Sequence, residues 1–330
     1  MLLVAFILGS ISISAVAKTT VSVSGSTTVL PLAEACAEAF NSQSSDYQVL
    51  VTGGGTGAGI TAAAEGRSDI AMASREVTAD EMKKYSNKFE QNEIGYDGVC
   101  IAVSKQIYDA GVTNLTKDQV KEIYAGNITN WNQVGGPDKP IYAIAREQGS
   151  GTRDTFNELI MGSTKAETKE STVAQGSAEV KTAIVGSDKA IGYVGFSYIQ
   201  DDTIKAIALN GVLPTVQSIK NGSYLLSRHL YLYTFGDPTP GAKAFIDFTK
   251  SAAGQNIAQE NGFIPLTSTA NVQPVESNVS QSSAQASGGQ APAQKTPGFE
   301  GIFALGSLLG VFYLILGGGP KNRLMTGLSF

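Results

Sequence analysis

The sequence predicts an α/β protein, and two features of the chain carry this prediction. Short apolar runs with strand-like alternation are followed repeatedly by helical stretches, an order typical of mostly parallel sheets covered by helices. Turns rich in glycine, serine and threonine stand between several of these runs and the helices. In such sheets ligands lie beyond the carboxyl ends of the strands, where helix N-termini converge. We therefore expect one binding site assembled from several turns.

The expected elements follow from apolar periodicity and from helix signals such as Pro31 at a helix start and Thr116 as an N-cap. Strands are expected at residues 20–23, 47–51, 69–72, 98–103, 141–145, 191–195 and 230–234. Helices are expected at residues 32–40, 60–65, 116–124, 154–160, 242–251 and 255–259.

Composition limits the classes of function. A chain of 330 residues can form two domains, and a net charge of −5 argues against a nucleic-acid surface. A single histidine, His229, argues against a zinc site built by the protein, so no metal is expected. Cys36 and Cys100 either form a disulfide or remain as two buried thiols, because sequence does not show whether they meet.

Both ends of the chain are typical of an exported protein. Residues 1–17 are apolar and end in Ala15-Val-Ala17, as in a signal peptide with its cleavage site. Residues 269–296 are rich in serine, glutamine, alanine and glycine, which predicts a disordered linker. In residues 297–330, Pro297-Gly-Phe299 opens an apolar run of about 18 residues, long enough at ~1.5 Å rise per residue to span a bilayer core.

This C-terminal order, with basic residues after the apolar run, resembles the PGF-type sorting signal of archaeal surface proteins. The resemblance implies a protein that is exported to the cell surface. An archaeosortase would recognise the tail and replace it with a lipid, so that the protein is attached to the membrane.

The most informative motif is Ala145-Arg-Glu-Gln-Gly-Ser-Gly-Thr-Arg153. It places the guanidinium of Arg146 shortly before Ser150, Gly151 and Thr152, at the start of an expected helix. Guanidinium, hydroxyl and backbone N–H donors together suit a tetrahedral oxyanion. The clusters at residues 24–28 and 52–57 have the same donor character, so the three clusters predict a shared anion site.

Other functions compete for these motifs. The glycine cluster lacks the lysine of a Walker A loop, but Gly53, Gly55 and Ala58 fit a dinucleotide fingerprint, with Glu76 near its acidic position. A plain glycine-rich turn is the third interpretation. Ser150 with His229 as its base would make a serine-type hydrolase, although the outer glycines of the nucleophile elbow are missing.

In combination, the motifs resemble the substrate-binding protein of the high-affinity phosphate ABC transporter, the PstS-like family. The similarity runs from about residue 20 to 267 and includes the sequences 25–29, 52–60, 69–75, 97–98, 123–131, 146–153 and 192–195. It implies a type II periplasmic-binding fold, with two α/β lobes that close over one phosphate in a central cleft and are joined by a two-strand hinge. We expect lobe 1 at residues 18–97 and 224–268 and lobe 2 at residues 98–223.

The resemblance also implies the contacts with the anion. By position in the family motifs, the phosphate-binding residues are Ser26, Thr27, Thr28, Thr56, Ser74, Arg75, Arg146, Ser150, Gly151 and Thr152. Some family members have an aspartate in place of Arg75, and this aspartate accepts the proton of the phosphate. Asp97 and Glu147 are the two candidates for that role here.

The resemblance implies a monomeric binding protein that has no catalytic activity and no cofactor. It would deliver inorganic phosphate to the permease subunits of an ABC transporter. Arsenate, tungstate or molybdate would fit a similar ring of donors and remain alternatives, and a secreted phosphohydrolase is the enzymatic one.

Overall fold

The computed structural model describes residues 17–86, 88–169 and 171–266. Its main sheet has the strand order β2-β1-β3-β11-β4-β8-β6-β7, with β9 paired to β4, and β10 pairs separately with β5. The strands are β1 (Thr19–Gly25), β2 (Tyr47–Gly53), β3 (Ile70–Ala73), β4 (Phe89–Val103), β5 (Asn114–Leu115), β6 (Tyr142–Arg146), β7 (Thr172–Ala174), β8 (Ala190–Gly195), β9 (Lys205–Ala206), β10 (Ala208–Leu209) and β11 (Ser227–Phe235).

The sheet is mixed: the expected parallel pairing is present within two groups of strands, and the strands that join these groups are antiparallel. β1 runs parallel to β2 and β3, and β6 runs parallel to β7 and β8. Between these groups, β11 is antiparallel to β3 and β4, and β4 is antiparallel to β8. The physical reason is the length of β4, which pairs with β11 up to Gly98 and with β8 from Val99 onward. One long strand thus joins the two parallel groups.

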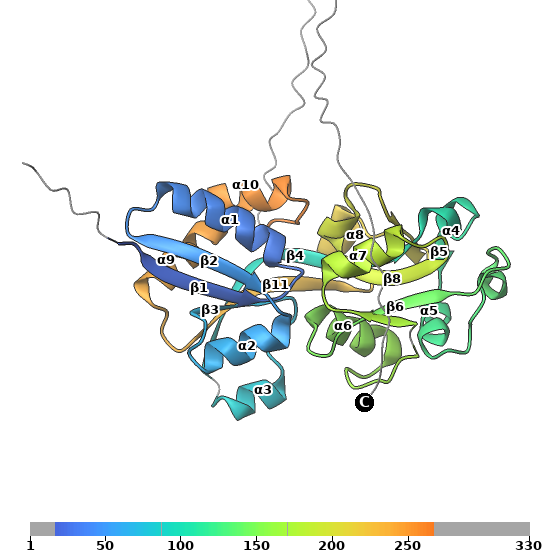
Figure 1. The fold of residues 1–330 in the computed structure, drawn as a ribbon, viewed down its shortest axis with the longest axis horizontal. Coiled ribbons are helices and arrows are strands. Elements are labelled where there is room, and N and C mark those ends of the chain that lie inside the picture. The colour runs from blue at the N-terminus through green and yellow to red at the C-terminus, as the bar shows by residue number, and fades with distance from the viewer. Residues whose placement is uncertain (1–16, 87, 170, 267–330) are drawn as a thin grey trace, which may run out of the picture. The chain divides into compact units, whose positions relative to one another are not determined.

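Helices cover both faces of each parallel group (Figure 1). They are α1 (Leu30–Gln43), α2 (Thr56–Ala64), α3 (Ala79–Lys84), α4 (Lys105–Asp109), α5 (Lys117–Tyr124), α6 (Gly151–Phe156), α7 (Ser177–Val185), α8 (Val216–Lys220), α9 (Pro240–Lys250) and α10 (Ala252–Glu260). Single turns lie at η1 (Trp131–Val134), η2 (Asn157–Met161) and η3 (Phe196–Ile199).

Most expected elements are present, with shifted bounds. Thr116 caps α5 through a capping box, as predicted. α2 begins at Thr56, four residues before the expected start, because the glycine loop itself forms the first helical turn. The expected helix at 154–160 begins at Gly151 instead, since the side chain of Ser150 accepts a hydrogen bond from Arg153 N and caps it.

Alternation along the strands separates the apolar core into clusters. On β11, Leu230 and Leu232 face one cluster with helices α1, α9 and α10, whereas Tyr231 and Tyr233 face another with α2. These two clusters draw on residues 21–94 and 230–263. Two further clusters form around β8 and draw on residues 99–226, together with Ile264. The long strand β4 passes from the first pair of clusters to the second.

Cys36 and Cys100 are free, buried thiols in different clusters, so they do not form a disulfide. Burial raises the pKa of Cys36 to about 12 and that of Cys100 well above its usual value, so neither thiol ionises readily.

Within residues 17–266, excluding 87 and 170, no helix is long and apolar enough to cross a bilayer. Three expected segments lie outside the described residues: the signal peptide at 1–17 (of which only Ala17 is described), the linker at 269–296 and the apolar segment at 297–330.

Candidate functional site

Four strand–turn–helix connections supply the polar groups of the candidate site. They join β1 to α1, β2 to α2, β6 to α6 and β7 to α7. Two glycines permit the tightest approaches. Gly25 has φ +134°, and a Cβ there would lie 2.4 Å from the Met72 carbonyl oxygen. Gly55 has φ +92° and precedes α2. The turns therefore bring backbone and hydroxyl donors close together in a way that larger residues would prevent.

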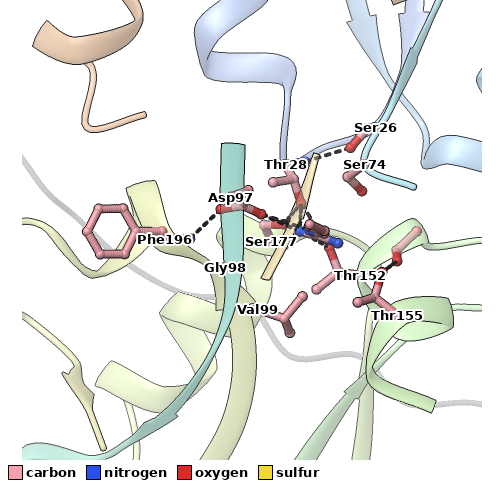
Figure 2. A network of polar contacts seen from close by, with 12 residues as sticks. Ser26, Thr28, Ser74, Asp97, Gly98, Val99, Thr152, Thr155, Ser177 and Phe196 are labelled. Carbon is pink, nitrogen blue, oxygen red and sulfur yellow. Dashed lines mark hydrogen bonds and ion pairs between the residues drawn. The ribbon is translucent and has the colours of Figure 1, made fainter. Parts of the chain in front are cut away.

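The hydroxyl groups of three turns meet at the centre of the site (Figure 2). Thr28 Oγ1 lies 2.9 Å from Thr152 Oγ1 and 3.4 Å from Ser177 Oγ. All three side chains are buried. Thr28 follows β1, Thr152 lies in α6 and Ser177 begins α7, so residues distant in sequence form one polar cluster.

Arg146 lies at the end of β6 and is only 1% exposed. Its Nη2 donates to Thr27 Oγ1 at 2.9 Å and its Nη1 to Ser177 Oγ at 3.0 Å. Nε and Nη2 also form a two-point ion pair with Glu147, with both distances 2.7 Å. A buried guanidinium of this kind is a strong, oriented donor next to the central hydroxyl groups.

A second group of predicted residues packs beside the first. Thr56 Oγ1 accepts a hydrogen bond from Ser74 N at 3.2 Å and lies 3.4 Å from Ser74 Oγ. Gly151 faces both hydroxyls, since a Cβ there would lie 2.6 Å from Thr56 Oγ1 and 2.7 Å from Ser74 Oγ. Nearby, Gly57 N donates to the Gly149 carbonyl oxygen at 2.9 Å. The glycine loop and the Arg146 motif are thus in direct contact.

The remaining predicted serines each accept a backbone hydrogen bond, and Ser150 thereby caps α6. Ser26 Oγ accepts from Thr28 N at 3.2 Å, and Ser150 Oγ accepts from Arg153 N at 3.3 Å. A hydroxyl that accepts a hydrogen bond still has its own proton to donate. Both serines are buried. Each can therefore donate its hydroxyl proton to an anion inside the site.

Arg75 is placed differently from the other predicted contacts. Its Nε donates to Asp154 Oδ2 at 2.7 Å, and both terminal nitrogens donate to Glu81, at 2.8 and 2.9 Å. Burial by itself lowers the pKa of Arg75, but Glu81 and Asp154 outweigh burial and raise it. The guanidinium is therefore engaged with two carboxylates, one of them across from it in α6, rather than with the central hydroxyl groups.

Asp97, a proposed proton acceptor, is 1% exposed and pairs with Arg228. Its Oδ1 accepts from Phe196 N at 2.7 Å, and its Oδ2 accepts from Arg228 Nε at 2.9 Å and Nη2 at 2.6 Å (Figure 2). Burial lowers the pKa of Arg228, and this exceeds the opposing effect of Asp97. The other proposed acceptor, Glu147, is engaged with Arg146 in the same two-point manner.

The sequence analysis missed Ser177 and Arg228. Ser177 follows β7 and Gly176, which is a fourth instance of the strand–glycine–hydroxyl–helix pattern. Arg228 is a buried charged residue in strand β11, which is rich in leucine and tyrosine. A search for charges at inward positions of strands would have found it. The structure also adds Tyr198, whose hydroxyl donates to the Thr27 carbonyl oxygen at 2.8 Å.

The enzymatic alternative finds little support in this geometry. Ser150 caps α6, and His229 on β11 lies 2.7 Å from Glu93 through Nδ1, with 44% of its side chain exposed. Among the residues that the structure describes, no hydrogen bond joins Ser150 to His229. The same residues contain no group of three or more His, Cys, Asp or Glu side chains arranged to hold a metal ion.

Comparison with protein families matches residues 12–253 to the PBP superfamily domain and residues 296–316 to the PGF-CTERM motif. The phosphate-binding protein PstS of Bacillus subtilis (strain 168) is 34% identical over 253 residues, which cover 76% of this chain and 82% of that protein. The phosphate-binding protein PstS of Staphylococcus saprophyticus is 33% identical over 258 residues, which cover 73% and 79%.

Two solved structures are similar over the same part of the chain. A protein from Clostridium perfringens, described as a phosphate ABC transporter substrate-binding protein and crystallised with bound phosphate, has a TM-score of 0.70 and 39% identity. The match covers 76% of this chain and all of that one. An ABC-type phosphate transport receptor from Vibrio cholerae has a TM-score of 0.62 and 33% identity, and covers 74% and 99%.

Proposed function

This chain belongs to the PstS family of the PBP superfamily and has the type II periplasmic-binding fold, and on this premise we propose that it captures inorganic phosphate and delivers it to an ABC transporter for import. Two lobes enclose the anion, lobe 1 at residues 18–97 and 224–268 and lobe 2 at residues 98–223. The strands β4 and β11 form the connection between them.

The observation that carries this proposal is the pairing of polar groups across the two lobes. Arg146 of lobe 2 donates to Thr27 of lobe 1, and Thr152 of lobe 2 lies 2.9 Å from Thr28 of lobe 1. A tetrahedral oxyanion accepts hydrogen bonds in several directions, and it is best satisfied by donors that surround it. A buried cluster of hydroxyls with a guanidinium, half from each lobe, has this property.

Binding follows from closure of the lobes. In an open form, phosphate reaches the turns and exchanges its water for the hydroxyl, amide and guanidinium donors. Because donors from both lobes bind the same anion, phosphate stabilises the closed form and shifts the population toward it. The closed surface is what the permease subunits recognise. The role is binding without catalysis, and the working unit is a monomer.

We propose one change to the contacts that the resemblance implied. Ser26, Thr27, Thr28, Thr56, Ser74, Arg146, Ser150, Gly151 and Thr152 form the phosphate-binding set that we propose. Arg75 instead contacts Asp154 of lobe 2 from lobe 1, so it holds the lobes together without touching the anion.

The chain carries the archaeal PGF-CTERM sorting signal at residues 296–316, so the protein is exported and anchored at the cell surface. This location suits the proposed role, because a binding protein tethered to the outer face of the membrane stays near its transporter. Attachment by the C-terminal segment and attachment by a lipid that replaces it would both keep the protein at the membrane.

Competitive calorimetry tests the proposal. Purified protein is titrated with phosphate, and then again in the presence of excess sulfate or excess tungstate. We expect phosphate to bind with 1:1 stoichiometry and sulfate not to compete. Tight tungstate binding with weak phosphate binding would assign the site to another oxyanion. Release of phosphate from a monoester, abolished by Ser150→Ala, would contradict the binding role and favour the hydrolase.

A further inference from the structure

The strongest unexplained group beside the site is the ion pair of Arg228 and Asp97. The two residues stand directly opposite each other in the antiparallel ladder of β11 and β4. Their side chains are 5% and 1% exposed, and the closest N···O distance is 2.6 Å. They lie where β4 passes from its pairing with β11 to its pairing with β8. The charges are therefore buried at the junction of the lobes.

The hydrogen bonds of Arg228 are incomplete. Nε and Nη2 donate to Asp97 Oδ2, and Nη2 is also 3.0 Å from Thr152 Oγ1 and 3.4 Å from Thr28 Oγ1. Nη1 is buried and has no hydrogen-bond partner among the described residues. A guanidinium carries five N–H donors, and a buried donor of a charged group that stays unpaired is strongly unfavourable.

The surroundings of the guanidinium indicate a ligand for the unpaired nitrogen. The same guanidinium contacts Thr28 and Thr152, the two hydroxyl groups that connect the lobes at the centre of the proposed phosphate site. Burial is the main cause that lowers the pKa of Arg228, and the nearby positive charge of Arg146 lowers it further. A site that contains two buried guanidinium ions is suited to bind an anion.

We propose that Arg228 is a second phosphate-binding arginine, which donates through Nη1 to the oxyanion bound beside Thr28 and Thr152. This inference rests on the proposed function. It places one arginine on each lobe, with Arg228 on lobe 1 and Arg146 on lobe 2, so that the anion bridges two positive charges across the closure.

Asp97 then has a positioning role. Its Oδ1 accepts a hydrogen bond from Phe196 N, and its Oδ2 accepts hydrogen bonds from Nε and Nη2 of Arg228. The carboxylate therefore fixes the direction in which the guanidinium points. Asp97 therefore acts through Arg228 and does not accept the proton of the ligand. The competing explanation is purely structural, with the pair holding β4 against β11.

Three variants separate these explanations. Arg228→Lys keeps the charge opposite Asp97 but loses the guanidinium fork, and R228Q/D97N removes both charges but keeps both side chains polar. Arg67→Gln is the matched control, because Arg67 is 61% exposed and pairs with Glu65 on the surface. Each protein is examined by calorimetry with inorganic phosphate and by thermal unfolding with and without phosphate.

We expect Arg228→Lys and R228Q/D97N to weaken phosphate binding by about ten- to hundredfold, the effect of one charge-assisted hydrogen bond, with R67Q unchanged. The phosphate-induced rise in Tm should shrink in both site variants. If wild-type protein binds phosphate and R228K, folded as shown by its cooperative unfolding, binds it equally well, the ion pair is only structural and this inference is overturned. If wild-type protein binds no phosphate, the proposed function fails and this inference fails with it.

Discussion

Removing the guanidinium of Arg146 is the most direct test of the phosphate site. Arg146→Ala deletes the donors to Thr27 and Ser177, which belong to opposite sides of the central cluster. It also leaves Glu147 without its ion-pair partner, and that side chain is only 14% exposed. The variant therefore removes an attraction for the anion and exposes the anion to a nearby negative charge.

The magnitude follows from these two effects. One hydrogen bond to a charged group contributes ~1.5–3 kcal/mol, which corresponds to a loss of about ten- to 150-fold in affinity. Two unit charges ~6 Å apart repel by about 3 kcal/mol at an effective dielectric constant of ~20. Arg146→Ala should thus weaken phosphate binding at least tenfold. R146A/E147Q, which also removes the carboxylate charge, should bind more tightly than Arg146→Ala alone.

Isothermal titration with phosphate measures both variants against the wild-type protein, and urea unfolding establishes that each is folded. Unchanged affinity in Arg146→Ala would refute the assignment of the site. Equal affinity of the single and double variants would refute the electrostatic part of the argument, since the unpaired carboxylate would then have no effect on the anion.

Two further predictions concern Gly151 and the carboxylates that face Arg75. Gly151→Ala should weaken phosphate binding at least tenfold in calorimetry, because its Cβ would displace Thr56 Oγ1, 2.6 Å away; wild-type affinity would contradict this packing. Glu81→Gln should lower the free energy of unfolding by ~1–3 kcal/mol and Asp154→Asn by less, although both face Arg75. Arg75 holds the pKa of Glu81 low, whereas burial raises that of Asp154. The contribution of Glu81 should therefore be present at pH 7 and be lost as the pH falls below ~4. Urea unfolding at several pH values measures both variants. A loss of stability in Asp154→Asn that equals or exceeds the loss in Glu81→Gln would contradict this prediction.

Local sequence patterns were enough to predict most of the elements that form the site. Strand alternation, the hydroxyl caps and the glycine turns depend on neighbouring residues, so α1, α5 and the motif before α6 are recognisable without tertiary information. The order of motifs along the chain also predicted the family, which the comparisons confirm. Ser177 escaped because β7 is only three residues long and gives a weak signal.

The sequence by itself determined the donor chemistry: Arg146 with hydroxyl-rich turns at the starts of helices predicted an anion site whatever the relative position of the turns. Only the tertiary structure decided which donors meet. It directed Arg75 toward Glu81 and Asp154, and it brought Arg228 next to Thr28 and Thr152. The physical reason is that an ion pair depends on which strands and helices lie side by side. The pairing of β4 with β11 joins residues 131 positions apart, and no local pattern in the chain encodes that separation.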